Sequence, residues 1–430
     1  MDYRMALEGR VKALPISEKQ VHWMLVLSAW AILMFVLLFM TGGPEEDVLN
    51  FYKHSEAIKS GLMPYRDFVF EFPPFSLAFF MMPGMFTSDL NTYATIFGAQ
   101  VILFIAIMLH YTLKICDRID VNKIAVAAIF TMFFIIYFPI RKFDVFPACL
   151  TVVAMYYFME RRFGLAYGFA AFATLTKIYP GLLILLFIVL NIAENDRNWK
   201  KNVATGAAAC LFVSLLAVLP LMSAGVSFSE ILGFVGFHSD RGFQVESLFA
   251  ESVRLLALVG IGTYQIVPLH DTHDVVGPIC EAVLPYWTAV MGVAIALSFI
   301  LALRYVTKNV CGHEKGWNDR SLILMSLVVI LTFMMFNKVF STQYMVWIML
   351  MMAMIPFMAK NDWMKAYVCV VVLLAVDFGR WFLQYDNTSD LYITFNFCRD
   401  VLLVLMMWMC VRTLRRPDSD DERVLDIRIG

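Results

Sequence analysis

The sequence predicts an all-α polytopic membrane protein with about twelve transmembrane helices and two long extracytoplasmic loops. Composition is the first reason: 60% of the 430 residues are hydrophobic and 16% are charged, whereas soluble domains average about 45–50% apolar and about 25% charged residues. The second reason is that long apolar segments follow one another along the chain. The third is that Lys and Arg are unequally shared between alternate connections. These observations exclude a soluble globular protein.

Twelve apolar segments approach the roughly 20 residues that a membrane-spanning helix needs. The fifth and sixth are short, and we expect them to form a hairpin that does not fully cross the bilayer. A further apolar stretch, 74–86, is shorter and contains Pro, so it predicts a helix lying at the membrane interface. The twelve segments are 22–40, 93–113, 124–140, 143–159, 163–176, 181–193, 202–222, 286–303, 321–336, 344–358, 366–383 and 391–411.

The basic residues predict the orientation of these segments. With the N-terminus in the cytoplasm, 23 of the 34 Lys and Arg residues fall on the cytoplasmic side and 11 on the other. The positive-inside rule therefore predicts a multi-pass cell-membrane protein with both termini cytoplasmic. Residues 1–20 are polar, so no cleavable signal peptide is expected. We expect one transmembrane domain over 1–411, a cytoplasmic tail over 412–430, and an active extracytoplasmic face formed by the loops 41–92 and 223–285.

Several function classes are disfavoured by missing motifs. The eight Cys residues include no CxxC pair and no zinc spacing, and no phosphate-binding or nucleophile-elbow motif is found where it would carry chemistry. The net charge of −1 gives no sign of a nucleic-acid partner. The run HDTHD at 270–274 has metal-ligand residue types, but a polar exposed loop is the favoured interpretation. No cofactor and no divalent metal is expected.

The first outer loop contains a possible general base. Glu45, Glu46 and Asp47 follow a Gly-Gly-Pro break, and a helix is predicted from Asp47 to Lys59. His54 lies seven residues after Asp47, so both side chains share one face of that helix. A carboxylate at the mouth of an apolar cavity is suited to accept a proton; the alternative is a solvated loop with ordinary acids. Further along, Arg66, Asp67 and Glu71 could line the same cavity, although surface ion pairs are favoured for them.

Basic residues lie at helix ends on the outer side, where the orientation rule does not favour them. Arg141 and Lys142 separate two apolar segments, with Asp144 just inside the second. Lys177 is at the tip of the short hairpin and Lys338 follows another apolar segment. Such residues either anchor helix ends by snorkelling or neutralise a lipid phosphate. Charge at membrane depth is costly and is usually functional.

Polar and aromatic residues near these cations are suited to bind a sugar. Gln343 and Tyr344 follow Lys338, and an amide next to an aromatic ring can combine hydrogen bonding with ring stacking. The second outer loop adds His238 and Arg241. The alternative for the aromatic residues is an interfacial belt.

The ordered motifs resemble glycosyltransferase family 87 of the GT-C superfamily, the polytopic mannosyltransferases that use a polyprenyl-phosphate sugar. The resemblance covers most of the chain. One departure is Thr342, where the family pattern leads us to expect Pro. The resemblance is carried by Asp47, Tyr52 and the stretches GLMPYRDFVFEFPP, RKFDVFPA, TKIYPG, DRGFQVES and FNKVFSTQYMVW.

The resemblance implies a GT-C fold and a hexosyltransferase. Such an enzyme would move a hexose, with mannose expected, from a polyprenyl-phosphate sugar to a lipid or glycan acceptor, with membrane lipids as further partners. Asp47 would deprotonate the acceptor hydroxyl, which attacks the anomeric carbon with inversion, although Glu45 and Glu46 are close enough in sequence to compete for this role. Cations would stabilise the departing phosphate. The implied donor phosphate-binding residues are Arg141, Lys142, Lys177, Arg241 and Lys338, and the implied substrate-binding residues are Tyr52, His54, Asp144, His238, Gln343 and Tyr344.

Two other functions are compatible with the sequence. A polytopic secondary transporter, or a flippase of a lipid-linked or anionic substrate, has a similar number of spans, but it usually has an internal repeat and ionisable sites near the midplane. The charges in this chain gather instead at outer helix ends and in the two long loops. A non-catalytic scaffold with the same fold is the second alternative, because fold alone does not establish function.

Overall fold

The computed structural model describes residues 46–137, 141–193, 198–239, 241–269, 272–310, 317–358, 362–382 and 389–415. The first predicted segment, 22–40, lies outside these residues; each of the other eleven falls on a helix. The helices that correspond to predicted spans are α5 (Leu90–Ile119), α6 (Lys123–Tyr137), α7 (Val145–Met159), α8 (Phe163–Thr174), α9 (Gly181–Ala193), α10 (Trp199–Ser223), α14 (Pro278–Val310), α15 (Asp319–Phe336), α16 (Met345–Met358), α17 (Trp363–Phe382) and α18 (Asp390–Leu414).

Within the described residues, five helices are long and apolar enough to cross a membrane: α5, α10, α14, α15 and α18. Shorter apolar helices, of 12 to 15 residues, run among them. The chain is therefore a multi-pass membrane protein. The number of twelve spans stays a prediction.

Burial separates the interior helices from the peripheral ones. All of α16 except Phe357 is buried, and a helix that is apolar all round belongs in an interior. The most apolar part of α15 is 78% buried, whereas the corresponding parts of α10 and α14 are 11% and 17% buried. The exposed apolar surfaces of α10 and α14 therefore face the lipid.

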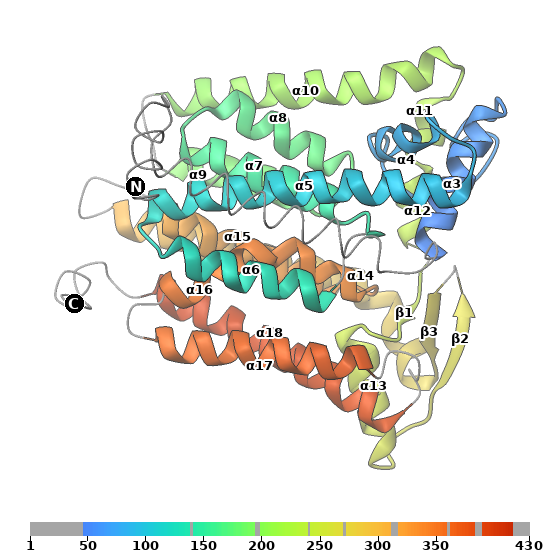
Figure 1. Cartoon of the computed structure of the whole chain (residues 1–430). Coiled ribbons are helices and arrows are strands. Elements are labelled where there is room, and N and C mark those ends of the chain that lie inside the picture. Colours follow the sequence, from blue (N-terminus) through green and yellow to red (C-terminus); the bar gives the residue numbers. More distant parts are fainter. Residues whose placement is uncertain are drawn as a thin grey trace, which may run out of the picture.

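The remaining elements gather at one end of the helix bundle, on the right in Figure 1. We call residues 46–89 the first outer segment and residues 224–277 the second outer segment. The first contains the two helices α3 (Glu46–Lys59) and α4 (Ser76–Gly84), close to the predicted helices 47–59 and 74–86. The second contains α11 (Phe228–Ile231), α12 (Gly233–Ser239), β1 (Phe243–Gln244), α13 (Leu248–Leu258), β2 (Gln265–Leu269) and β3 (Thr272–Val276).

Aromatic rings hold the first outer segment together. Phe51 of α3 stacks on Phe80 of α4, with ring centroids 4.3 Å apart and an interplanar angle of 8°. Phe72 meets the ring of Phe80 edge-on at 5.1 Å and that of Phe143 at 5.4 Å. Such ring pairs add about 0.5–1.5 kcal/mol beyond their buried area. The packing fixes α3 against the beginning of α7.

The second outer segment departs from the all-α prediction. It contains a three-stranded antiparallel sheet in the order β1-β3-β2, in which Phe243 pairs with Val275 and Gln265 with Val276. Val, Ile and Phe at these positions suit a half-buried strand. The sheet packs on α13 and the start of α14 through a second apolar cluster that includes Val253. Short strands inside a long connection carry too little periodicity to be recognised in the sequence.

Candidate functional site

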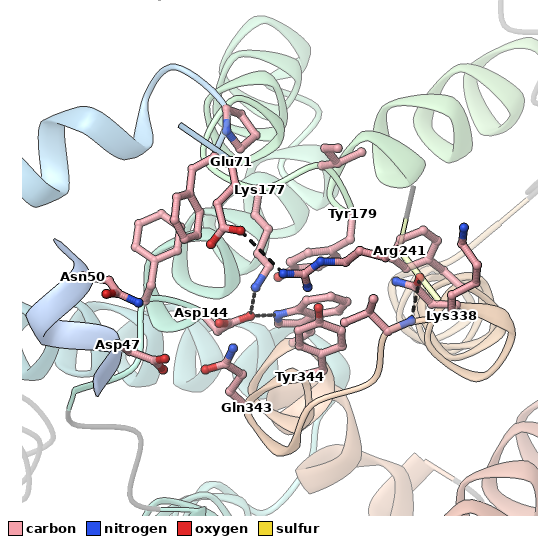
Figure 2. Close-up of a pocket in the computed structure, with 18 of the residues that line it drawn as sticks. Asp47, Asn50, Glu71, Asp144, Lys177, Tyr179, Arg241, Lys338, Gln343 and Tyr344 are labelled. Atoms are coloured by element: carbon pink, nitrogen blue, oxygen red, sulfur yellow. Dashed lines mark hydrogen bonds and ion pairs between the residues drawn. The ribbon is translucent and has the colours of Figure 1, made fainter. Parts of the chain in front are cut away.

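A cavity of about 410 Å³ lies where the two outer segments meet the helix bundle. Its walls come from the outer elements α3, the connection before α4 and Arg241 near β1, and from the bundle elements α7, α14, α15 and α16 together with the α8–α9 connection. Figure 2 draws most of these residues. Charged residues of both signs line it, among apolar and aromatic side chains: Glu46, Asp47, Glu71, Asp144, Lys177, Arg241 and Lys338.

The rim of the cavity is formed by Asp47 and Lys142. Asp47 is in the first turn of α3, where the positive end of the helix dipole favours a carboxylate. Its Oδ2 accepts a hydrogen bond from Lys142 Nζ at 2.9 Å. The Asp47 side chain is 39% exposed and the Lys142 side chain 29% exposed. The pair is therefore accessible to water and to a substrate.

The floor of the cavity is formed by Asp144, Lys177 and Trp347. Asp144 precedes α7 but its carboxylate makes no capping hydrogen bond there. Instead, Oδ1 accepts from Lys177 Nζ and from Trp347 Nε1, each at 2.6 Å. Asp144 is 1% exposed. Burial lowers the pKa of Lys177 and the Asp144 carboxylate raises it, with a net increase, so Lys177 stays charged.

Three stacked rings support the floor. The Trp347 ring lies between those of Tyr179 and Tyr344, with both centroid separations 4.0 Å. Lys177 Nζ lies over the ring of Tyr344 at 4.7 Å. The Tyr344 hydroxyl is a side-chain group that can donate or accept a hydrogen bond.

The wall opposite Asp47 contains Arg241 and Lys338. In Figure 2, Asp47 and Asn50 lie on one side, Arg241 and Lys338 on the other, and Asp144 and Lys177 between them. Arg241 Nη2 is 3.6 Å from Glu71 Oε2, which links the two outer segments. This is a longer separation than at the rim or the floor, and the Arg241 guanidinium also lies over the ring of Phe237 at 5.1 Å.

The structure brings together seven of the twelve residues predicted for the site. Lys142 joins them through its contact with Asp47, and the buried Arg141 precedes it in sequence without lining the cavity. The His238 side chain and Glu45 lie outside the described residues. The seven lining residues are Asp47, Asp144, Lys177, Arg241, Lys338, Gln343 and Tyr344.

Tyr52 and His54 lie away from the cavity lining. The Tyr52 hydroxyl donates to the Ser88 carbonyl oxygen at 2.7 Å. The His54 ring stacks on Phe68 at 5.5 Å and meets Phe70 edge-on at 5.1 Å. Burial, assisted by Lys53, lowers the pKa of His54 to about 4. In these positions both side chains support α3, and Asp47 and His54 do not point into a common space as their spacing predicted.

Other lining residues escaped the sequence analysis or were set aside in it. Glu71 was favoured as a surface ion pair, but it lines the cavity, whereas Arg66 and Asp67 do pair at the surface at 2.9 Å. Trp347 was attributed to a possible interfacial belt. Asn50 could have been found as the residue one turn after Asp47 on the predicted helix.

Among the described residues, no group of three or more His, Cys, Asp or Glu side chains is placed to hold a metal ion. Of the HDTHD run, Asp274 is buried and its Oδ2 accepts from the Gly242 backbone N–H at 3.2 Å. This carboxylate therefore joins β1 to β3.

Residues 70–269 match the family model of glycosyltransferase family 87, and no curated protein matches the chain. The fold is similar to the crystal structure of ArnT from Cupriavidus metallidurans bound to undecaprenyl phosphate, with a TM-score of 0.48 and 13% sequence identity, over 91% of this chain and 77% of that chain. The chain resembles glycosyltransferase family 87, as the ordered motifs predicted. The matched range includes Glu71, Asp144, Lys177 and Arg241.

Proposed function

We propose that this membrane protein, which resembles glycosyltransferase family 87, is an inverting hexosyltransferase. It would take a hexose, with mannose expected, from a polyprenyl-phosphate sugar and transfer it to a lipid or glycan acceptor on the extracytoplasmic face. The observation that carries the proposal is the arrangement of charge in one cavity. A carboxylate accessible to water lies on one side, and two cations lie on the other.

The cavity is suited to bind a phosphate. Arg241 lines the cavity, and the planar guanidinium of an arginine can bind a phosphate dianion through two parallel hydrogen bonds. Three helices, α7, α9 and α16, also begin beside the cavity, and helix N-termini favour anions. We assign Arg241 and Lys338 as the principal phosphate ligands. Lys177 adds to the positive electrostatic potential in the cavity, although its charge is paired with that of Asp144.

Asp47 is proposed as the general base. The acceptor hydroxyl gives its proton to the carboxylate while its oxygen forms a bond to the anomeric carbon. The bond between that carbon and the phosphate oxygen breaks, and the electron pair leaves with the polyprenyl phosphate. Attack from the side opposite the leaving group inverts the anomeric configuration. Arg241 and Lys338 stabilise the charge that develops on the phosphate, and Lys142 releases Asp47 when substrate enters the rim.

A transfer assay tests the proposal. The purified protein in nanodiscs is given a short-chain polyprenyl-phosphate mannose, or the glucose equivalent, together with a membrane lipid extract, and new glycolipids are followed by mass spectrometry. Asp47→Asn should lower kcat by about 10²- to 10⁴-fold. Glu56→Gln is the matched control, because Glu56 is on the same helix and also pairs with a lysine, Lys59, at 2.7 Å.

The outcomes separate the alternatives. A product that forms with Glu56→Gln but not with Asp47→Asn supports the enzyme and its base. Near-normal turnover by Asp47→Asn removes Asp47 from that role. Donor consumption without a glycolipid identifies a transferase with another acceptor, such as a glycan. If neither donor is bound or consumed, the proposal fails and the transporter hypothesis takes its place.

A further inference from the structure

The segment between α15 and α16 carries much of the cavity wall on a short turn. Lys338 lies in the extended part after α15, and Gln343 and Tyr344 lie in η2 (Thr342–Tyr344), a single 3-10 turn that leads into α16. One such turn has weak hydrogen-bond geometry and little stability of its own. Its conformation must therefore be set by groups outside the turn.

Glu246, in the second outer segment, contacts this turn from behind the cavity. Its Oε2 accepts from the backbone N–H of Thr342 at 3.2 Å and from the Thr342 hydroxyl at 3.3 Å. Its Oε1 accepts from the hydroxyl of Tyr392 in α18 at 2.5 Å. Glu246 is not itself among the residues that line the cavity. Both carboxylate oxygens are thus used to join the turn to a distant helix.

Glu246 is held in place by a buried cation. Arg399 of α18 donates from Nη2 to the Glu246 carbonyl oxygen at 2.9 Å, and its guanidinium lies over the ring of Phe340 at 4.1 Å. Arg399 also pairs with Asp400 at 2.7 Å, and both side chains are fully buried. Hydrogen bonds to charged groups are stronger than those between neutral groups, and more is lost when one partner is removed from a buried site. The position of Glu246 is therefore well determined.

A second contact fixes the other end of the segment. The backbone N–H of Gln244 in β1 donates to the Lys338 carbonyl oxygen at 2.9 Å. The two contacts are made by residues two apart on the second outer segment, and they reach Lys338 and Thr342 respectively. Arg241 precedes the same strand. The second outer segment therefore determines the relative positions of Arg241, Lys338 and the η2 turn.

We propose that Glu246 is a positioning residue that holds Gln343 and Tyr344 in the wall of the cavity through its hydrogen bonds to Thr342. This rests on the proposed function, in which Gln343 and Tyr344, expected from the sequence to bind substrate, contact the sugar of the donor. It also gives a role to Thr342, the residue at which the family pattern leads us to expect Pro. A Pro has no N–H and could not make the backbone hydrogen bond to Glu246.

The first test measures the turn without relying on activity. Amide hydrogen exchange of residues 337–345 is compared in the full-length protein, Glu246→Met, Glu246→Gln and the control Glu281→Met, which removes an exposed acid in the first turn of α14. Exchange at Thr342 should rise at least tenfold in Glu246→Met, rise less in Glu246→Gln, and stay unchanged in the control. Unchanged exchange in Glu246→Met overturns the proposal, whatever reaction the protein catalyses.

The second test separates positioning from general stability. Glu246→Met should raise the KM for the polyprenyl-phosphate sugar about ten- to a hundredfold, with a smaller change in kcat, and Glu246→Gln should recover part of the loss because its amide oxygen still accepts one hydrogen bond. A variant that only loses folded protein would lower kcat and leave KM unchanged, and that result overturns the proposal. A wild-type protein that is inactive with both donors overturns the proposed function instead, while the exchange measurement still decides whether Glu246 holds the turn.

Discussion

Two Asp–Lys pairs lie in one cavity, at the rim and at the floor. At the rim, Lys142 Nζ is 2.9 Å from Asp47 Oδ2, and the side chains are 29% and 39% exposed. At the floor, Lys177 Nζ is 2.6 Å from Asp144 Oδ1, and the side chains are 19% and 1% exposed. Asp144 has a second donor in Trp347 Nε1.

The difference in burial assigns different tasks to chemically identical groups. A buried carboxylate with two fixed donors can exchange its partners only at a large cost in free energy. Both the carboxylate and the lysine would then be unpaired charges in a medium of low dielectric constant. A carboxylate at the rim can exchange a lysine for water or for a hydroxyl at little cost. The floor pair is therefore suited to fix the shape of the cavity, and the rim pair is suited to take part in proton transfer.

The largest expected effect on stability comes from breaking the floor pair. Lys177→Met leaves the buried Asp144 without its cation and should lower the free energy of unfolding by about 3–5 kcal/mol. Thermal and chemical unfolding in detergent would measure it. Adding Asp144→Asn should recover part of the loss, because the uncompensated charge is then gone. A Lys177→Met protein as stable as wild type would contradict the assignment of a buried ion pair.

A smaller loss is expected when one donor to Asp144 is removed. Trp347→Phe keeps an aromatic ring between Tyr179 and Tyr344 but loses the Nε1–H donor, and should cost about 1.5–3 kcal/mol. Trp287→Phe is the matched control, because its Nε1 donates to the neutral Phe336 carbonyl at 2.8 Å and its loss should cost about 0.5–1.5 kcal/mol. Equal losses in the two variants would show that the charge on Asp144 does not matter.

The stability of the folded protein should depend on pH through His54, which lies in α3, the helix that carries Asp47. Burial lowers the pKa of His54 to about 4 from its usual 6.5, so the unfolded chain binds more protons than the folded protein between these values. Stability should therefore fall by a few degrees in melting temperature as the pH decreases from about 6.5 to about 4. His54→Phe should show a smaller decrease over the same range. Parallel curves for the two proteins would exclude His54 as the source.

The smallest stability effect is expected at the rim. Lys142→Met should change the free energy of unfolding by no more than about 1 kcal/mol, as for other exposed pairs. Lys59→Met, which breaks the exposed pair with Glu56, is the comparison. A loss at Lys142 as large as that at Lys177 would remove the distinction between rim and floor.

Much of the helical architecture was predictable because its signal is local. Apolar length identified the helices α5 to α10 and α14 to α18, and Gly-Gly-Pro together with the residues that follow identified α3. The sheet of the second outer segment was missed because β1 has only two residues and its partner β3 is reached after α13 and β2. Strand pairing of this kind depends on contacts between distant residues rather than on local periodicity.

The site was predictable where charge conflicts with its surroundings. Lys177 and Lys338 stood out because charged side chains at the ends of apolar helices, on the side predicted to be outside, are costly and usually functional. Glu71 did not stand out, since its partner Arg241 belongs to the other outer segment and nothing local connects them. His54 was expected in the site because helical spacing places it on the same face as Asp47. The rings of Phe68 and Phe70 occupy the space beside it, and neither ring is close to His54 in the sequence.

The short helices set the depth of the cavity within the bilayer. The floor and the turn beside it lie at the beginnings of α7, α9 and α16, which have 15, 13 and 14 residues. At 1.5 Å per residue these helices are about 20–22 Å long, and the hydrocarbon core is about 30 Å thick. If these helices reach one surface of that core, they stop about 8–10 Å short of the other. Under the proposed function, a lipid headgroup would then meet the cavity below the usual membrane surface, where local thinning could accommodate it, at a depth set by the lengths of these helices.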